Sequence, residues 1–304
     1  MKLKADFHSH HCFWDPDKLG GYYDLEKRKY ATFPEIKMEG RAPIMRELLD
    51  LAFSRGINFF TITSCRHQQQ EDKRWDYFKR DYVIGYDSEG IGENGMRFRL
   101  PGDFGGEIYV FHGQELKTDR GDVNILFAEK QIPIIPSKCD SMNASFYETL
   151  RAARDCGDHT IVSLCHPSRR GDLRWEEIKR LYEGERIDCV EAFDGMNLPW
   201  RNRQAIRDAE DVEIPWLAVS DGHRPCDLGK AYIEMNVPDC FNPEIIGKED
   251  NDYSDFRSQV HNNVRNGKFK QVKGYCSPLS QALYVLRLKE SIAIRKKGLD
   301  NYFQ

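Results

Sequence analysis

Predicted strands and predicted helices alternate along most of the chain, and this alternation constrains the fold more than any other sequence feature. Between residues 160 and 220, three short apolar runs at 160–165, 187–193 and 216–220 are separated by amphipathic segments at 174–182 and 199–209. Strands that alternate with helices in this way pair in parallel, with the helices packed outside them. The pattern predicts an α/β fold, and a barrel of the (β/α) type fits the 304 residues better than two domains.

The alternation extends less regularly toward both ends of the chain. Apolar periodicity predicts further strands at 3–8, 58–63, 108–114, 122–128 and 230–235, and further helices at 43–55, 144–156, 255–265 and 278–296. Residues 119–121 indicate a turn, and Asn143 is a candidate N-cap. The charged, glycine-rich stretch 68–106 predicts an insertion or loop subdomain. We therefore expect one barrel domain over 1–304, with this insertion and a helical, basic C-terminal segment at 250–304.

Composition excludes several classes of protein. Apolar residues make up 40% of the chain, and no run approaches the ~18 consecutive apolar residues of a membrane span, so we expect an ordered protein without a transmembrane helix. The N-terminal residues lack the apolar core of a signal peptide. The nine cysteines are scattered without a Cys-x-x-Cys pair, which argues against a disulfide framework. These features predict a soluble, cytoplasmic protein and leave its oligomeric state open.

Charge is unevenly distributed along the chain. The formal net charge is −4, yet the segment 264–297 holds nine Lys or Arg residues and a single acid, Glu290, for a net charge of +8. The remainder of the chain is therefore strongly acidic. A basic segment on an acidic body can bind a polyanion such as nucleic acid, or it can be the solvated face of a helix. Both interpretations remain open at this point.

Histidines and carboxylates gather at the C-terminal ends of the predicted strands, where barrels of this type build their sites. These residues are His8, His10, Glu115, His166, Asp221 and His223. His8 and His10 are two residues apart, so their side chains should point to the same side of a strand, and Asp221 and His223 follow the same rule. Neutral imidazoles and carboxylates are ligands of Zn²⁺, Mn²⁺ or Fe. Since six such groups exceed the needs of one tetrahedral ion, the sequence predicts a centre with more than one ion.

Four short motifs resemble the metal motifs of the PHP (polymerase and histidinol phosphatase) family. They occur in the family's order at 6–10 (DFHSH), 113–115 (GQE), 164–167 (LCHP) and 220–223 (SDGH). The stretch 256–267 also resembles the C-terminal helix of stand-alone members. The resemblance runs from residue 6 to about residue 236. It implies a distorted (β/α)7 barrel that holds one to three divalent ions of Zn, Mn or Fe and hydrolyses phosphoesters.

The resemblance assigns metal ligands residue by residue. It implies that the first metal site consists of His8, His10, Glu115 and Asp221. Glu115 would bridge to a second ion that His166 also binds, and Asp15 and His223 match a third site.

Two positions depart from the family's pattern. Cys65 stands where the family has a histidine ligand, and Asn124 stands where it has another. A thiolate binds zinc or iron, so Cys65 is a candidate ligand, although a buried apolar thiol is an equal alternative. Asn is a poor zinc ligand, so these departures are expected to weaken the second site.

The resemblance implies a hydrolytic mechanism in which a metal-activated water attacks phosphorus. Such a site needs cations that grip the phosphate. The candidate catalytic residues are Arg169, Arg224 and His223, with Arg170, Arg66 and Lys117 as weaker candidates beside the motifs. Glu191 and Asp194, at the end of the strand predicted at 187–193, are candidates for orienting the histidines.

The function that the resemblance implies is a phosphatase acting on a small phosphomonoester, such as histidinol phosphate or a nucleotide. One alternative is a nuclease or phosphodiesterase that uses the basic segment 264–297 and the aromatic residues of 68–106. A second alternative is a non-catalytic metal-binding regulatory protein, which Cys65 and Asn124 motivate. A third is a metal-dependent amidohydrolase. The arginines beside the histidine motifs favour phosphate.

Overall fold

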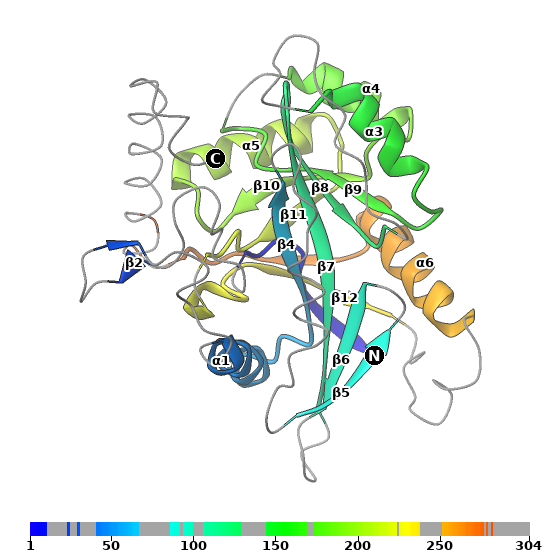
Figure 1. Ribbon diagram of the computed structural model, residues 1–304. Coiled ribbons are helices and arrows are strands. Elements are labelled where there is room, and N and C mark those ends of the chain that lie inside the picture. Colours follow the sequence, from blue (N-terminus) through cyan, green and yellow to red (C-terminus); the bar gives the residue numbers. More distant parts are fainter. Residues whose placement is uncertain are drawn as a thin grey trace.

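The computed structural model describes residues 1–10, 23–24, 29–30, 41–66, 86–91, 94–99, 106–128, 144–169, 173–223, 225–237, 251–276, 278 and 281. A strongly curved mixed sheet forms their centre, and helices cover its outer face (Figure 1). The strands of this sheet are β1 (Lys2–Asp6), β4 (Phe59–Arg66), β5 (Asp87–Ile91), β6 (Gly95–Arg99), β7 (Glu107–Thr118), β8 (Gly121–Leu126), β9 (Ile161–Leu164), β10 (Cys189–Asp194), β11 (Trp216–Val219), β12 (Tyr232–Asn236) and β13 (Lys270–Val272). A separate ribbon pairs β2 (Tyr23–Asp24) with β3 (Lys29–Tyr30).

The described helices are α1 (Arg41–Ser54), α3 (Phe146–Arg154), α4 (Trp175–Glu183), α5 (Pro199–Asp211), α6 (Asn251–Arg265) and the short 3-10 helix η3 (Pro225–Asp227). None of these helices is long and apolar enough to cross a membrane.

The sheet consists of two parallel runs joined by one reversed strand. Its strand order is β11-β10-β9-β8-β7-β4-β1-β12-β13. The strands β9, β10 and β11 are parallel to one another, and so are β1, β4 and β7. Between the two runs, β8 is antiparallel to both of its neighbours. At the far edge, β12 and β13 are also antiparallel to their partners.

Backbone contacts between the segments that follow β1 and β11 nearly close the sheet into a barrel. The amide of Asp221 donates to the carbonyl of His8 at 2.9 Å, and the amide of His10 donates to the carbonyl of Gly222 at 2.8 Å. Ser9 and Gly222 form a parallel bridge. The strand β11, at one end of the strand order, therefore approaches β1, two strands from the other end, where the predicted ligands lie.

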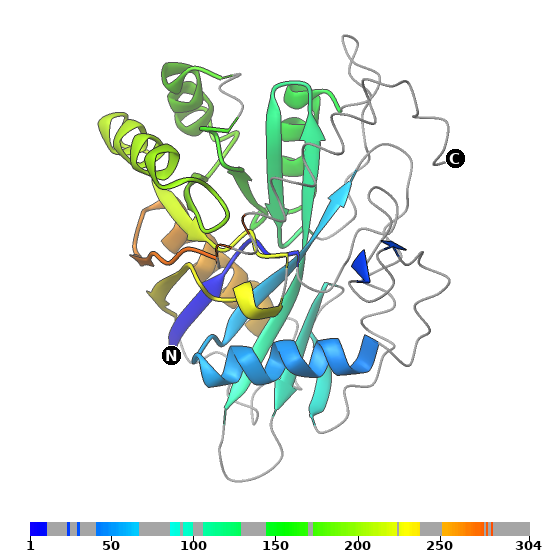
Figure 2. The ribbon, with the colours of Figure 1, turned by 90° about the vertical axis from the view of Figure 1, so that its left-hand side faces the viewer.

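Three apolar clusters follow from the alternation of side chains along the strands. Phe60 and Ile62 of β4 point outward to α1, whose Leu48, Leu49 and Ala52 cover them, whereas Phe59 points into the barrel. The helix α6 packs Phe256, Val260 and Val264 against strand residues that point into the barrel. Residues of α3, α4 and α5 pack against the outer faces of β8, β9, β10 and β11 (Figures 1 and 2). The apolar core thus fills one end of the barrel and leaves the other end to polar side chains.

The predicted α/β class and barrel-like architecture are confirmed, whereas the expectation that all strands run parallel is wrong. A two-residue turn, Asp119 and Arg120, joins β7 to β8, and a turn of this length permits only antiparallel pairing because a parallel crossover needs a dozen residues or more. The seven-unit (β/α)7 count stays a prediction, as do the single domain over 1–304 and the insertion.

The stretch 68–106 contains regular structure that its composition did not predict. Its strands β5 and β6 form a hairpin, and β6 pairs with the first half of β7, so the hairpin extends the main sheet. Residues 68–85, 92–93 and 100–105 lie outside the described residues.

The N-cap of α3 differs from the prediction. The candidate cap Asn143 lies outside the described residues, and the side chain at the N-cap position, Ser145, makes no capping bond. Instead, the carboxylate of Asp119, in the turn after β7, accepts a hydrogen bond from the amide of Phe146 at 3.0 Å. The predicted helix at 278–296 lies almost entirely outside the described residues.

Candidate metal centre

The predicted ligands meet inside the barrel at the carboxyl ends of its parallel strands. His8 and His10 follow β1, Glu115 lies in the last third of β7, His166 follows β9 and Asp221 follows β11. All five side chains are buried. The sequence prediction that these residues gather at one edge of the sheet matches their positions.

Three of these residues direct lone pairs at one point. The Nδ1 atom of His10 lies 2.8 Å from the carbonyl oxygen of Thr63, which can only accept, so Nδ1 carries the proton and Nε2 a lone pair. The Nδ1 atom of His8 donates in the same way to Oε2 of Glu191 at 2.7 Å. The two Nε2 atoms are 3.0 Å apart, and Oδ1 of Asp221 lies 3.3 Å from that of His10 and 3.8 Å from that of His8. This set is called the first group below.

The first group fits a divalent ion. Three acceptor atoms at such short separations repel one another unless a cation lies between them. Ligand atoms at the 2.0–2.1 Å bond length of tetrahedral zinc lie about 3.4 Å apart, and the three separations in the first group bracket that value. His8, His10 and Asp221 would therefore hold the ion.

The proton affinities of the first group reflect the same convergence. Burial alone would lower the pKa of His8, but the carboxylates of Glu191 and Asp221 raise it to about 9. Burial alone would raise the pKa of Asp221, but Arg169, His10 and His8 hold it well below its usual range. A metal ion would thus compete with a proton for the same lone pairs.

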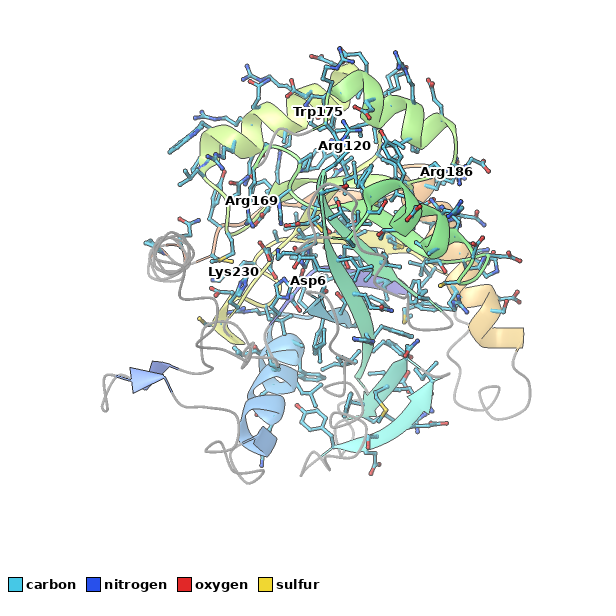
Figure 3. The ribbon with its side chains drawn as sticks, turned by 45° about the horizontal axis from the view of Figure 1, so that its top comes forward. Asp6, Arg120, Arg169, Trp175, Arg186 and Lys230 are labelled. Carbon is cyan, nitrogen blue, oxygen red and sulfur yellow. The ribbon has the colours of Figure 1, made fainter. Side chains whose placement is uncertain are left out.

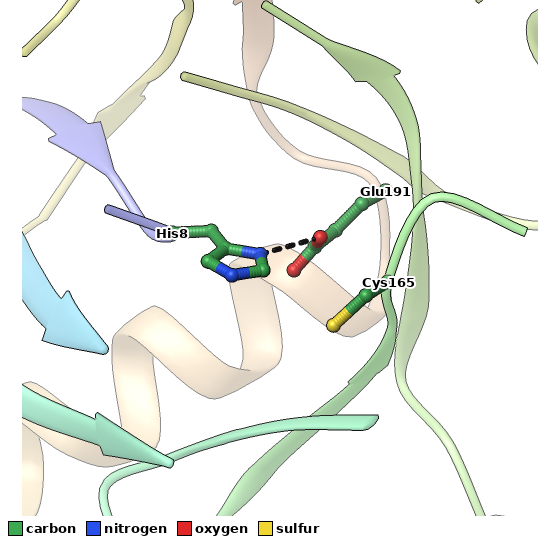
Figure 4. Close-up of side chains that lie close together, drawn as sticks. All are labelled: His8, Cys165 and Glu191. Carbon is green, nitrogen blue, oxygen red and sulfur yellow. Dashed lines mark hydrogen bonds and ion pairs between the residues drawn. The ribbon is translucent and has the colours of Figure 1, made fainter. Parts of the chain in front are cut away.

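Glu191 fixes the orientation of His8 (Figure 4). Its other oxygen, Oε1, accepts hydrogen bonds from Oγ of Ser163 at 3.0 Å and from Nδ2 of Asn124 at 3.2 Å. This contact with His8 agrees with the position expected from the sequence for Glu191, whose orienting role stays a prediction. The Cys165 thiol lies beside this pair, and burial together with Glu191 raises its pKa well above the usual range, so it remains a neutral thiol.

We expect Glu191→Gln to weaken metal binding by about 10- to 100-fold, the usual effect of losing a carboxylate that orients a metal-bound histidine. The substitution keeps the size of the side chain and removes its charge. Isothermal titration of the purified variant with Zn²⁺ or Mn²⁺ measures the change. An affinity equal to that of the unmodified protein would show that Glu191 does not position His8.

A second group of ligand atoms adjoins the first. It consists of Glu115, Asp122 and His166, whose ligand atoms all lie within 4.8 Å of one another. The Nε2 atom of His166 is 3.6 Å from Oε1 of Glu115 and 3.9 Å from Oδ2 of Asp122. Oε2 of Glu115 lies 3.6 Å from Nε2 of His10, so this carboxylate connects the two groups.

Asp122 is the member of the second group that sequence reasoning missed. It lies in β8, two residues before Asn124, and both side chains are buried. Since residues two apart on a strand share a face, the position of Asn124 in the expected ligand pattern was a signal for Asp122. Asn124 has a different role, because its Nδ2 atom donates to the carbonyl of Phe7 at 3.0 Å as well as to Glu191.

Arg169, which Figure 3 labels, contacts the first group through Asp221. Its Nη2 atom donates to Oδ2 of Asp221 at 2.7 Å and also contacts Oδ2 of Asp194. Burial raises the pKa of Asp194 to about 6, against the opposing effect of Arg169. The guanidinium is mostly buried, so its position is fixed by these two carboxylates.

Two residues of the centre adopt a left-handed backbone conformation that residues other than glycine rarely adopt. His166 has φ = 30° and Asp221 has φ = 47°. Such left-handed residues persist where the surrounding structure holds them, and they concentrate at functional sites. In both cases the residue is the second one after the end of a strand, β9 for His166 and β11 for Asp221.

The structure describes only some of the other predicted site residues. The Nδ1 atom of His223 donates to the carbonyl oxygen of Asp221 at 2.9 Å, and its ring lies 4.8 Å from that of His10. Cys65 is described by its backbone alone, which pairs with that of Glu115. Asp15, Arg170 and Arg224 lie outside the described residues. The third site therefore stays a prediction.

The fold and the centre together define an α/β protein whose nearly closed sheet holds buried histidines and carboxylates at one end. A family model described as PHP-associated matches residues 199–244. Comparison with curated proteins found no match.

Two solved structures share the fold. PsfC from Pseudomonas syringae PB-5123 is 14% identical, with a TM-score of 0.53 over 96% of this chain and 99% of PsfC. A two-domain protein from Bacteroides vulgatus ATCC 8482, described as containing a predicted PHP-like metal-dependent phosphoesterase, is 16% identical, with a TM-score of 0.51 over 90% of this chain and 65% of that protein. The family-model match supports the resemblance to the PHP family over residues 199–244, which include the motif at 220–223, and the two solved structures show the shared fold.

Proposed function

We propose that this protein is a metal-dependent hydrolase of phosphoester bonds, acting as a phosphatase on a small phosphomonoester. The observation that carries the proposal is the convergence of three lone pairs from His8, His10 and Asp221 beside a fixed guanidinium, that of Arg169. The PHP-associated match and the description of the Bacteroides protein support the same class of reaction.

Each part of the site has a task in such a reaction. A divalent ion at the first group would polarise a phosphoryl oxygen and lower the pKa of a water molecule. His8 and His10 would hold that ion through Nε2, because their Nδ1 protons are committed to Glu191 and Thr63. Arg169 would neutralise the equatorial phosphoryl oxygens, a task for which a planar guanidinium is suited. Arg224, His223, Asp15 and Cys65 enter the proposal from the sequence alone.

The experiment that tests the proposal combines metal analysis with a substrate panel. Protein purified without chelator is analysed for Mn, Fe and Zn and then assayed with p-nitrophenyl phosphate, sugar phosphates, nucleotides, bis-p-nitrophenyl phosphate and carboxylic amides. Bound metal with metal-dependent release of phosphate supports the proposal. Bound metal without any turnover supports the regulatory alternative, and turnover of amides alone supports the amidohydrolase alternative.

Arg169→Gln is expected to reduce kcat/KM for a phosphomonoester by about 100-fold, the typical loss when one donor to a developing charge is removed. Steady-state kinetics measure the change. Arg186→Gln is the matched control, because Arg186 is exposed in the loop before β10. Equal kinetics of the Arg169 variant and the control would remove Arg169 from the proposed machinery.

The described part of the basic segment 264–297 bears on the nuclease alternative. Arg265 pairs with Asp188 and Glu185, and the Lys273 ammonium lies 5.7 Å from the ring centroid of Trp216. These two cations therefore serve contacts within the chain. A nuclease would bind single-stranded oligonucleotides with an affinity that falls steeply with salt, and a filter-binding series between 50 and 200 mM salt would reveal this dependence as a loss of roughly 10³-fold or more.

A further inference from the structure

The positively charged side chain of Lys117 lies beside the second group of ligand atoms. The Nζ atom of Lys117 lies 3.0 Å from Oδ2 of Asp122 and 3.4 Å from Oε1 of Glu115. The two carboxylates are buried, and the lysine side chain is 23% exposed. The ammonium group therefore reaches inward from the edge of the centre and contacts both acids.

The ladder between β7 and β8 fixes this arrangement. Lys117 stands directly opposite Asp122, and Glu115 stands directly opposite Asn124. Since Glu115 and Lys117 are two residues apart on β7, their side chains leave the strand on the same face. Side chains that stand opposite each other on neighbouring strands interact directly, so strand register brings the ammonium between the two carboxylates.

Charge balance requires a cation at this place. Two carboxylates that leave water together must be compensated, because burying an unpaired charge costs several kcal/mol. The Lys117 ammonium, at 3.0 Å from Asp122 and 3.4 Å from Glu115, supplies charge that a second divalent ion would otherwise supply.

In the second group the ammonium lies nearer to the carboxylates than the imidazole does. Nζ of Lys117 is 3.0 Å from Oδ2 of Asp122 and 3.4 Å from Oε1 of Glu115, whereas Nε2 of His166 is 3.9 and 3.6 Å from the same two atoms. Asn124, which stands opposite Glu115, commits its amide nitrogen to Glu191 and to the carbonyl of Phe7. A divalent ion held by Glu115 and Asp122 would lie close to the ammonium and be repelled by it.

A second fixed cation also lies beside the first group. It is the Arg169 guanidinium, which contacts Asp194 and Asp221. The first group is thus flanked by one ammonium and one guanidinium. Each of them bridges two carboxylates, one of which, Glu115 or Asp221, adjoins the histidines.

We propose that Lys117 takes the place of a second metal ion, so that the two ligand groups of the described residues hold one divalent ion, at His8, His10 and Asp221, beside two fixed cations. The inference rests on the proposed function, because it concerns the metal content of the same centre. It goes beyond that function by assigning a role to Lys117 and a stoichiometry to the site.

The test counts Mn²⁺ ions per chain. Metal-free protein is loaded with excess Mn²⁺, freed of unbound metal by gel filtration, and analysed by elemental analysis and electron paramagnetic resonance. The unmodified protein should retain one ion and give the six-line spectrum of an isolated Mn²⁺. Lys117→Met and Lys117→Gln should each retain two ions and give the broadened spectrum of an interacting pair. Lys117→Arg keeps the charge and should retain one ion.

Other results would overturn the inference in distinguishable ways. If the unmodified protein retains two ions and Asp122→Asn retains one, the second group is a metal site and the role of Lys117 is wrong, while the proposed function stands. If the folded Met and Gln variants both retain a single ion, Lys117 does not exclude a second metal. If the unmodified protein retains no Mn²⁺, Zn²⁺ or Fe²⁺ at all, the proposed function fails and the inference fails with it.

Discussion

Asp221→Asn is expected to lower metal affinity by more than about 100-fold and to abolish measurable phosphoester hydrolysis, because it removes the only anionic ligand of the first group as described. The amide keeps the size of the side chain, and asparagine tolerates the left-handed backbone that this position requires (φ = 47°). Arg169 loses one of its two carboxylate partners but keeps Asp194. The loss should therefore arise in the centre rather than in the fold.

Titration with Zn²⁺ or Mn²⁺ and a phosphomonoester assay measure these two effects, and circular dichroism confirms that the variant is folded. Asp211→Asn is a matched control, since Asp211 is exposed at the end of α5. Full activity in the Asp221 variant would refute the assignment of the first group. His8→Ala makes an independent test, with the same loss expected, although it also leaves Glu191 buried without its histidine.

Asp188→Asn should reduce the free energy of unfolding by about 3 kcal/mol, which is what breaking a buried ion pair typically costs. Asp188 is fully buried just before β10. Its carboxylate accepts from the amide of Val162 at 2.9 Å, from Arg154 of α3 at 2.9 Å, and from His261 and Arg265 of α6 at 3.2 and 3.1 Å. The Asp188 carboxylate thus connects α3 and α6 to the sheet at the amino end of β10, away from the metal centre.

The pH dependence gives this prediction a second check. Burial alone would raise the pKa of Asp188, but His261 and Arg154 lower it from 3.8 to about 2. A lowered pKa in the folded state stabilises the protein fully above pH 3.8, and this stabilisation is lost as the pH falls toward 2. The shift corresponds to about 2.5 kcal/mol, in line with the expected loss.

Urea denaturation should therefore show that the free energy of unfolding of Asp188→Asn is lower than that of the unmodified protein at pH 7. This difference should shrink between pH 4 and pH 2. Metal affinity at pH 7 should be unchanged, because the network lies at the other end of β10. Equal free energies of unfolding at pH 7, or a difference that is as large at pH 2 as at pH 7, would contradict the role of Asp188.

The order of elements and the positions of the main candidate ligands could be predicted from the sequence because both depend on local signals. Apolar periodicity located the strand that carries Glu115 and the strands that precede His8, His166 and Asp221. The predicted alternation along 3–8 was less exact, since β1 ends at Asp6 and the two histidines lie on the segment that follows it. Their convergence depends on contacts with Thr63 and Asp221, which lie far away in the sequence.

The features that the sequence did not reveal depend on partners from distant elements. Asp119 caps α3 from another turn, and nothing within the helix sequence signals this. The sequence signalled Asp122 only indirectly, through the strand face that it shares with Asn124, and the register of β7 and β8 places Lys117 opposite it. The reversal of β8 was readable in principle, because the turn at 119–121 is too short for a parallel connection, but the surrounding strand–helix alternation outweighed that signal.

The hydrogen bonds that join the segments after β1 and β11 have a consequence for how the protein is made. Ser220 and His8, whose hydroxyl and carbonyl lie 3.4 Å apart, are separated by 212 residues. During synthesis His8 and His10 leave the ribosome long before Asp221 is made. Their contacts with Asp221 can form only after more than 200 further residues have been translated. A metal ion captured at that moment would act as a cross-link between two distant parts of the chain, so the supply of metal and the completion of folding are linked in time.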